Sequence, residues 1–239
     1  MYGKIKCCQA NRFTVLSVIC LFNYLEMTAE YKKLDNPAWY ALSETHACFA
    51  KGTDELKRYD PDVVLFAGFC SENENVFDAL DQVINLQDSF FLFDRFPALP
   101  KNYTIETVIE CLQMVCNAPV PADITADIVL LNETNTDAMF SLVSEVFPGY
   151  YLRHTRRIGD YYGIFQDGKL AAMAGERLCM ERFTEVSAVV THPSYTGRKY
   201  AQQLVTQLTN KNMQAGTISF LHTGANNERG IKIYELPGY

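Results

Sequence analysis

Apolar and polar residues alternate most regularly in the second half of the chain, where periods of two and of about 3.6 residues indicate strands and helices in turn. Asp167-Gly168 is a dipeptide typical of hairpin turns, and Gly216 stands just past a helical pattern, where glycine commonly ends a helix. The predicted elements are strands at 127–131, 161–166, 170–177, 183–191 and 218–221, a helix ending at 146 that Asn132 or Thr134 caps, and a helix at 201–215. Because a helix connects the last two strands, they should be parallel. We therefore expect an α/β fold, a mixed sheet with helices on both faces.

The first half of the chain predicts a smaller α/β unit. Its expected elements are a helix opened by Asn36-Pro37, buried strands at 63–67 and 90–93, a helix at 76–86, and a strand or short helix at 104–114. The proline-rich tract at 118–122 is the linker candidate. The expected domains are an N-terminal extension at 1–30, an α/β domain at 31–121 and a second domain at 122–239.

Residues 1–26 differ from the rest. Basic residues precede an apolar run at 13–22, which resembles the start of a secretory signal but has no small-residue cleavage site before Asn23. The run is shorter than the roughly 20 residues that a transmembrane helix needs to span the bilayer. Translation that begins at Met27 explains it equally well, so we expect a cytoplasmic protein without a membrane partner.

Composition excludes several classes of protein. The 239 residues carry a formal net charge of −7 and a pI near 5.1, which argues against nucleic acid as the main partner. The eight cysteines have no C-x-x-C spacing and form no zinc pattern with the four histidines, so we expect reduced thiols and no metal.

The segment F-T-E-V-S-A-V-V-T-H-P-S-Y-T-G-R-K-Y-A, residues 183–201, predicts a strand, a glycine-bearing turn and the start of a helix. Pro193 cannot donate to a strand ladder and therefore ends the strand. The first turn of a helix has unpaired N–H groups and a positive dipole, and Gly197 permits close approach to the backbone. Such a unit can bind a phosphate, although many units of this kind bind nothing.

The sequence of this turn resembles the acetyl-CoA motif of the GNAT N-acetyltransferase superfamily; it reads V-T-H-P-S-Y-T-G-R-K-Y-A. The segment from Phe220 to Tyr239, with Asn227 and Tyr234 seven residues apart, is similar to the end of that family's fold. The first half resembles the extended subgroup, which carries an extra N-terminal domain. The chain departs from the family pattern at Thr196 and Lys199. The family pattern continues with a further strand beyond Tyr239, so either the sequence is incomplete or the sheet of this domain lacks its last strand.

The resemblance implies that acetyl-CoA is the co-substrate. Its pantetheine chain would pair with the backbone of Val189, Val190 and Thr191, and Asn227 would contact the cofactor arm. The pyrophosphate would lie on the N–H groups of Thr196, Gly197, Arg198, Lys199, Tyr200 and Ala201.

The resemblance also assigns proton-transfer roles. Tyr234 matches the family's general acid, and a phenol with a pKa near 10 can protonate a departing thiolate. Glu185 lies where some members use a carboxylate as base through a water, with Glu176 as a second candidate; a solvated strand glutamate remains an equal alternative. Cys179 has no basic neighbour in sequence, so a covalent cysteine mechanism is not expected.

We therefore expect an N-acetyltransferase that transfers acetyl from acetyl-CoA directly to a primary amine in a ternary complex. The acceptor is a small-molecule or a peptide amine, and a homodimer is an open possibility. The alternative is a non-catalytic acyl-CoA-binding or interaction module with the same fold.

Overall fold

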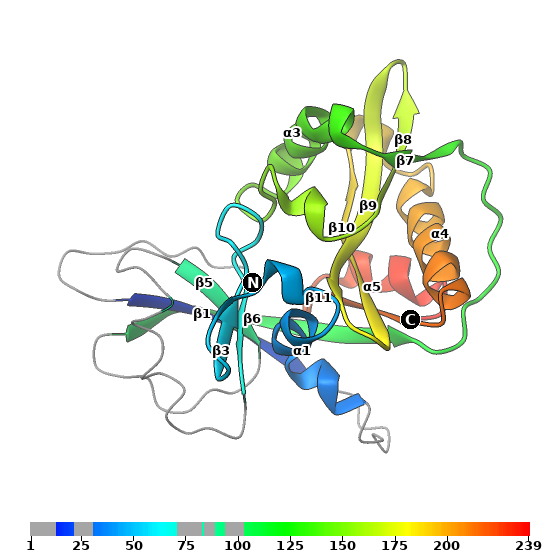
Figure 1. The fold of residues 1–239 in the computed structure, drawn as a ribbon. Coiled ribbons are helices and arrows are strands. Elements are labelled where there is room, and N and C mark those ends of the chain that lie inside the picture. The colour runs from blue at the N-terminus through cyan, green and yellow to red at the C-terminus, as the bar shows by residue number, and fades with distance from the viewer. Residues whose placement is uncertain (1–12, 22–30, 71–82, 84–88, 94–102) are drawn as a thin grey trace. The chain divides into compact units, whose positions relative to one another are not determined.

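The computed structural model describes residues 13–21, 31–70, 83, 89–93 and 103–239. The chain divides into two compact units (Figure 1). The first comprises Met1–Pro61, Leu65–Gln113 and Gly224–Asn226, and the second comprises Asp62–Val64, Met114–Thr223 and Asn227–Tyr239. The helix predicted at 76–86 lies outside the described residues except for position 83. Within the described ranges, no helix is long and apolar enough to cross a membrane.

In the first unit, strand β1 (Phe13–Leu21) lies between β5 (Ser89–Phe93) and β6 (Tyr103–Cys116) and is parallel to both. The apolar run that resembles a secretory signal is therefore a strand that is hydrogen-bonded along both edges. The strand predicted at 90–93 is confirmed, and the segment at 104–114 is a strand rather than a short helix.

A second, antiparallel sheet of this unit is formed by β2 (Lys51–Gly52), β3 (Leu56–Arg58) and β4 (Ala67–Phe69). The 3-10 helices η1 (Tyr31–Asp35) and η2 (Ala47–Phe49) flank the predicted helix, which is α1 (Pro37–Ser43). Helix α1 packs so closely on β4 that a Cβ atom on Gly68 would lie 2.3 Å from the backbone nitrogen of Trp39.

The strand predicted at 63–67 is wrong, because β4 begins only at Ala67. A turn that starts at Pro61 extends through Val63, so Val63 and Val64 are buried without joining a ladder, and Phe66 forms only an isolated bridge with Phe91. The carbonyl of Val63 instead accepts a hydrogen bond from Thr155 Oγ1 at 2.6 Å. The segment has the apolar composition of a buried strand because its residues are largely buried, although most of them are not in a strand.

The second unit contains a mixed sheet in the order β7-β8-β9-β10-β11. Its strands are β7 (Ile128–Leu131), β8 (Tyr161–Gln166), β9 (Lys169–Cys179), β10 (Phe183–Thr191) and β11 (Ile218–Gly224). Successive strands from β7 to β10 are antiparallel to one another, and β11 is parallel to β10 as predicted. The helices are α3 (Thr136–Val146), α4 (Tyr200–Gln214) and α5 (Glu228–Glu235), with 3-10 turns η4 (Glu133–Asn135), η5 (Thr155–Ile158) and η6 (Pro193–Tyr195).

Helices α3 and α4 cover opposite faces of this sheet (Figure 1). Alternate strand residues divide between two cores, as a period of two requires. The core under α3 contains Leu131, Met139, Leu142, Val143, Tyr151, Tyr161, Leu170, Met173 and Val190. The core under α4 contains Ile164, Ala172, Ala174, Val186, Leu204, Val205 and Leu208. The predicted mixed sheet with helices on both faces is confirmed.

Candidate active site

Strands β10 and β11 separate part-way along their length. Their pairing is confined to three consecutive positions, 183–185 against 218–220. Strand β10 continues to Thr191 and β11 to Gly224 without further pairing between them. The backbone groups on this edge of β10 are therefore placed to pair with an extended ligand chain.

A β-bulge lies on β10 where the strands have separated. From Ser187 to Val190 the strand advances three residues, while β9 opposite advances two. Ala188, at φ 49°, takes the left-handed conformation that such an extra residue needs. It packs against the core under α3, and Val189 packs against the core under α4. The bulge therefore places the predicted cofactor backbone, Val189 to Thr191, at the open edge.

The turn after β10 leads directly to the N-terminus of α4. Gly197 has φ 80°, and a Cβ atom added there would meet nothing within 4 Å. Lys199 precedes the helix at φ 60°, a conformation that glycine usually supplies, and its side chain makes no capping hydrogen bond. The first-turn N–H groups of α4 have no side-chain cap, and residues 196–199 are exposed. This is the geometry that an anionic group requires.

Of the two C-terminal candidates, Tyr234 lies on α5 and Asn227 directly precedes it. Tyr234 is half-buried against the core under α4, and burial raises its pKa to about 12, so the hydroxyl is protonated at neutral pH. The Asn227 side chain caps the helix, since its Oδ1 accepts from Gly230 N at 3.0 Å and its Nδ2 donates to Thr223 Oγ1 at 3.2 Å. Helix capping therefore already uses the side-chain amide of Asn227.

Glu185 is fully buried on the face that α3 covers, and its carboxylate is completely engaged. Arg177 donates to it twice, and His222 Nδ1 lies 2.7 Å from Oε1. Burial by itself would raise the pKa of Glu185, but the Arg177 charge and these hydrogen bonds outweigh it and lower the pKa to about 2. A carboxylate with so low a pKa is a weak proton acceptor at neutral pH.

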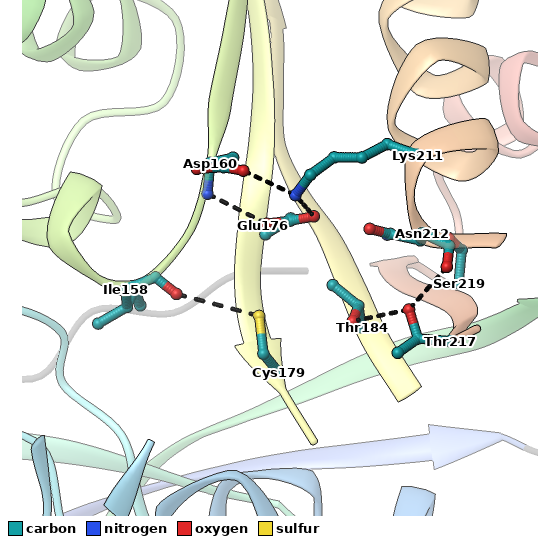
Figure 2. A network of polar contacts seen from close by, with 9 residues as sticks. All are labelled: Ile158, Asp160, Glu176, Cys179, Thr184, Lys211, Asn212, Thr217 and Ser219. Atoms are coloured by element: carbon teal, nitrogen blue, oxygen red, sulfur yellow. Dashed lines mark hydrogen bonds and ion pairs between the residues drawn. The ribbon is translucent and has the colours of Figure 1, made fainter. Parts of the chain in front are cut away.

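The second carboxylate candidate, Glu176, also has charged partners (Figure 2). Lys211 Nζ lies 2.6 Å from Glu176 Oε1 and 2.8 Å from Asp160 Oδ2, and Glu176 Oε2 accepts from the Asp160 backbone N–H at 3.1 Å. Burial opposes the charge of Lys211, but its hydrogen bonds with Asp160 and Glu176 raise its pKa overall. This network ties the end of α4 to β8 and β9, which is a structural role.

Comparison with known proteins decides the family. The family model described as FR47-like protein matches residues 161–239. A solved structure of a GNAT-family acetyltransferase from Novosphingobium aromaticivorans is 32% identical to this chain, covers 86% of this chain and 92% of its own, and has a TM-score of 0.78. The chain belongs to the GNAT acetyltransferase family. It is a GNAT-type acyltransferase, and its fold supports acetyl transfer.

Other solved structures are less similar to this GNAT protein. A GNAT-family acetyltransferase from Colwellia psychrerythraea is 20% identical, covering 54% of this chain and 52% of its own, with a TM-score of 0.46. An aminoglycoside N-acetyltransferase in complex with CoA is 17% identical, covering 50% and 91%, with a TM-score of 0.43. No curated protein matches the sequence.

The GNAT domain contains one partly buried cysteine near its candidate carboxylates. Burial, reinforced by the charge of Glu176, raises the pKa of Cys179 to about 12, and its thiol lies 4.0 Å from the Ile158 carbonyl oxygen (Figure 2). A thiol with this pKa is not an activated nucleophile. Among the described residues, no group of three or more His, Cys, Asp or Glu side chains is arranged to hold a metal ion.

Sequence reasoning missed Arg177 and His222, the two partners of Glu185. Arg177 lies eight residues before Glu185 across a hairpin, and His222 lies 37 residues after it on β11. No motif joins these positions. The available signal was strand alternation, because Phe220 pairs with Glu185 and His222, two residues further on, shares its face.

Proposed function

We propose that this GNAT protein transfers the acetyl group of acetyl-CoA directly to a primary amine within a ternary complex. The observation that carries the proposal is the continuity between the open edge of β10 and the uncapped N-terminus of α4. The open edge of β10 can pair with an amide-containing chain, and the N-terminus of α4 offers N–H donors to a diphosphate. Acetyl-CoA contains both groups in that order.

The residues of the strand and turn fit this co-substrate. The pantetheine amides pair with the backbone of Val189, Val190 and Thr191. The pyrophosphate lies on the N–H groups of residues 196–201, where the open space around Gly197 admits it. Arg198 and Lys199 are exposed cations beside this position and add favourable charge. Asn227 acts indirectly by fixing the start of α5.

Tyr234 is the general acid in this proposal. Its hydroxyl stays protonated at neutral pH and can donate to the sulfur as negative charge develops there. Direct attack is favoured over a covalent intermediate because Cys179 is not activated. In this proposal the second unit, which includes most of residues 122–239, is the catalytic domain, and the first unit is a separate domain.

The acceptor is a small-molecule or peptide amine. The segment at 147–159 follows α3 and exposes Phe147 and Tyr150, side chains suited to contact an apolar part of the acceptor. This segment contributes to acceptor choice in the proposal.

Calorimetric titration of acetyl-CoA into the full chain tests the co-substrate, with S-acetylpantetheine as a control that lacks the phosphates. We expect acetyl-CoA to bind and the control to bind far more weakly. A thiol-release assay with a panel of small amines and peptides then tests transfer. Binding without thiol release from any amine would favour the non-catalytic module, and no binding at all would overturn the proposal.

A further inference from the structure

A histidine and a carboxylate form a close pair beside the place where β10 and β11 separate. His222 Nδ1 lies 2.7 Å from Glu185 Oε1, and both side chains are buried. His222 follows Phe220, the last residue of β11 that pairs with β10, by two positions. The imidazole is therefore on the part of β11 that no longer pairs with β10, on the face that Glu185 shares.

The pair determines which imidazole nitrogen carries the hydrogen. Glu185 is ionised and accepts hydrogen bonds only, so Nδ1 of His222 must be the donor. In the neutral imidazole the lone pair then lies on Nε2. Arg177 keeps the carboxylate ionised and fixes its position through two hydrogen bonds of 2.8 and 2.6 Å.

Two buried tyrosines on the same face point to a polar ligand near this pair. Tyr151 and Tyr161 pack edge to face with ring centroids 5.8 Å apart, and Tyr161 interacts electrostatically with Glu185 and Arg177. Among the described residues, neither hydroxyl has a hydrogen-bond partner beyond the other tyrosine. Two hydroxyls that bond to each other still leave one donor unused, which a bound water or a polar acceptor group can satisfy.

The acid and the histidine lie on opposite faces of the sheet. Tyr234 packs with the core under α4, whereas Glu185 and His222 are on the face under α3. A thioester held at the β10 bulge would lie at the open strand edge between these faces. An amine can then approach from one face while the thiolate is protonated from the other.

We infer that His222 is the proton acceptor in acetyl transfer, oriented by Glu185, and that Arg177 positions Glu185. The inference rests on the proposed function. As the amine nitrogen forms its bond to the acetyl carbon, its proton passes to His222 Nε2. The carbon–sulfur bond breaks, and the thiolate takes a proton from the Tyr234 hydroxyl. His222 then loses its proton to solvent and Tyr234 regains one, so the sum is amide plus free thiol.

Among the described residues, the titratable groups that interact with Glu185, the partner of His222, are Arg177, Tyr161 and Cys179. Burial raises the pKa of Cys179 to about 12 and that of Tyr161 well above its ordinary value. Glu185, with a pKa of about 2, stays ionised, and Arg177 stays charged. A limb of the pH–rate profile that disappears when His222 is replaced therefore belongs to His222.

The kinetic test compares His222→Gln with the wild-type full chain, using one amine that the wild type accepts. We expect kcat to fall about a hundredfold or more, with the wild-type fall in rate at low pH reduced to that of the amine itself. Acetyl-CoA affinity should stay within about twofold, because no cofactor contact is removed. His46→Gln is the control, since it removes another hydrogen-bonded imidazole, 2.8 Å from the Tyr59 hydroxyl, from the other unit. It should leave the pH profile unchanged.

A second measurement does not depend on turnover. A long-range ¹H–¹⁵N correlation spectrum, with the His222 signals assigned by their loss in His222→Gln, reports which nitrogen is protonated. We expect hydrogen on Nδ1 and a bare Nε2 in the neutral ring. The opposite tautomer, or an unchanged kcat in His222→Gln, overturns the inference while leaving acetyl transfer intact. A wild type that releases no thiol with any amine overturns the proposed function and this inference together.

Discussion

Arg177 donates two hydrogen bonds to Glu185, from Nε to Oε2 at 2.8 Å and from Nη2 to Oε1 at 2.6 Å. The carboxylate is fully buried, while the Arg177 side chain remains partly exposed. A buried charge of this kind is tolerated only because its partner matches it in geometry. The pair therefore joins β9 and β10 and sets the charge state beside His222.

Arg177→Gln should destabilise the protein by about 3–5 kcal/mol, because it leaves the Glu185 carboxylate buried without its cation. Urea unfolding at neutral pH measures this change. Arg153→Gln is the control, since Arg153 pairs with Asp137 on the exposed surface and should cost less than about 1 kcal/mol. Equal effects from both variants would contradict the role of the buried pair.

The same pair predicts how stability depends on acid. The folded-state pKa of Glu185 is about 2, below its ordinary value of 4.5. The ionised Glu185 therefore contributes its full share of the folding stability above the unfolded pKa. That share, about 3 kcal/mol, is lost as the pH falls from about 4.5 to about 2. The free energy of unfolding, measured across this window, should fall more steeply in the wild type than in Arg177→Gln. Parallel curves would show that Glu185 is not held by Arg177.

Gly175→Ala should destabilise the second unit, because a Cβ atom there would lie 2.2 Å from Cδ1 of the buried Tyr161 ring. We expect a loss of about 3 kcal/mol in urea unfolding, since a packed ring cannot move aside cheaply. Gly163→Ala is the matched control on the neighbouring strand. Its Cβ would meet only the flexible ends of Leu131 and Leu170, so its cost should be smaller. The reverse order would contradict this packing.

Gly197→Glu should abolish acetyl-CoA binding, because it adds bulk and negative charge where the pyrophosphate is proposed to lie. Gly216→Glu is a close control, since Gly216 has φ 81° against 80° at Gly197, and both have open surroundings. Both variants should lose a similar amount of stability, about 1 kcal/mol, from the left-handed backbone. Calorimetric titration should show lost binding in the first variant alone. Unchanged affinity in Gly197→Glu would mean that the phosphates bind elsewhere.

Tyr234→Phe should lower kcat about a hundredfold with little change in the Kd for acetyl-CoA, because its hydroxyl acts on the sulfur when negative charge develops there, in the transition state. Tyr239→Phe is the control on the same side of the sheet. The Tyr239 hydroxyl bonds Thr209 Oγ1 at 2.8 Å, so its loss should cost about 1 kcal/mol of stability and leave kcat unchanged. Full activity in Tyr234→Phe would remove the general acid from the proposal.

The local elements of the second unit and their order could be predicted from the amino-acid sequence alone. The Asp167-Gly168 turn and the apolar spacing before Gly216 predicted a hairpin and a helix, and both are confirmed. Turn chemistry and helical spacing depend on residues a few positions apart in the chain, so both can be recognised in one sequence. The motif of the turn after β10 was likewise sufficient to indicate the family, because its residues are contiguous in the chain.

The chemical state of the candidate site, in contrast, depends on tertiary contacts. Glu185 faces α3, is bound by Arg177 and His222, and is therefore ionised and fully occupied. The bulge at Ala188 changes the facing of every later residue in β10, which a strict period of two cannot reveal. Likewise, Val63 is buried without belonging to a strand. These features arise from contacts between residues far apart in the chain, so they cannot be predicted from the local pattern of apolar and polar residues.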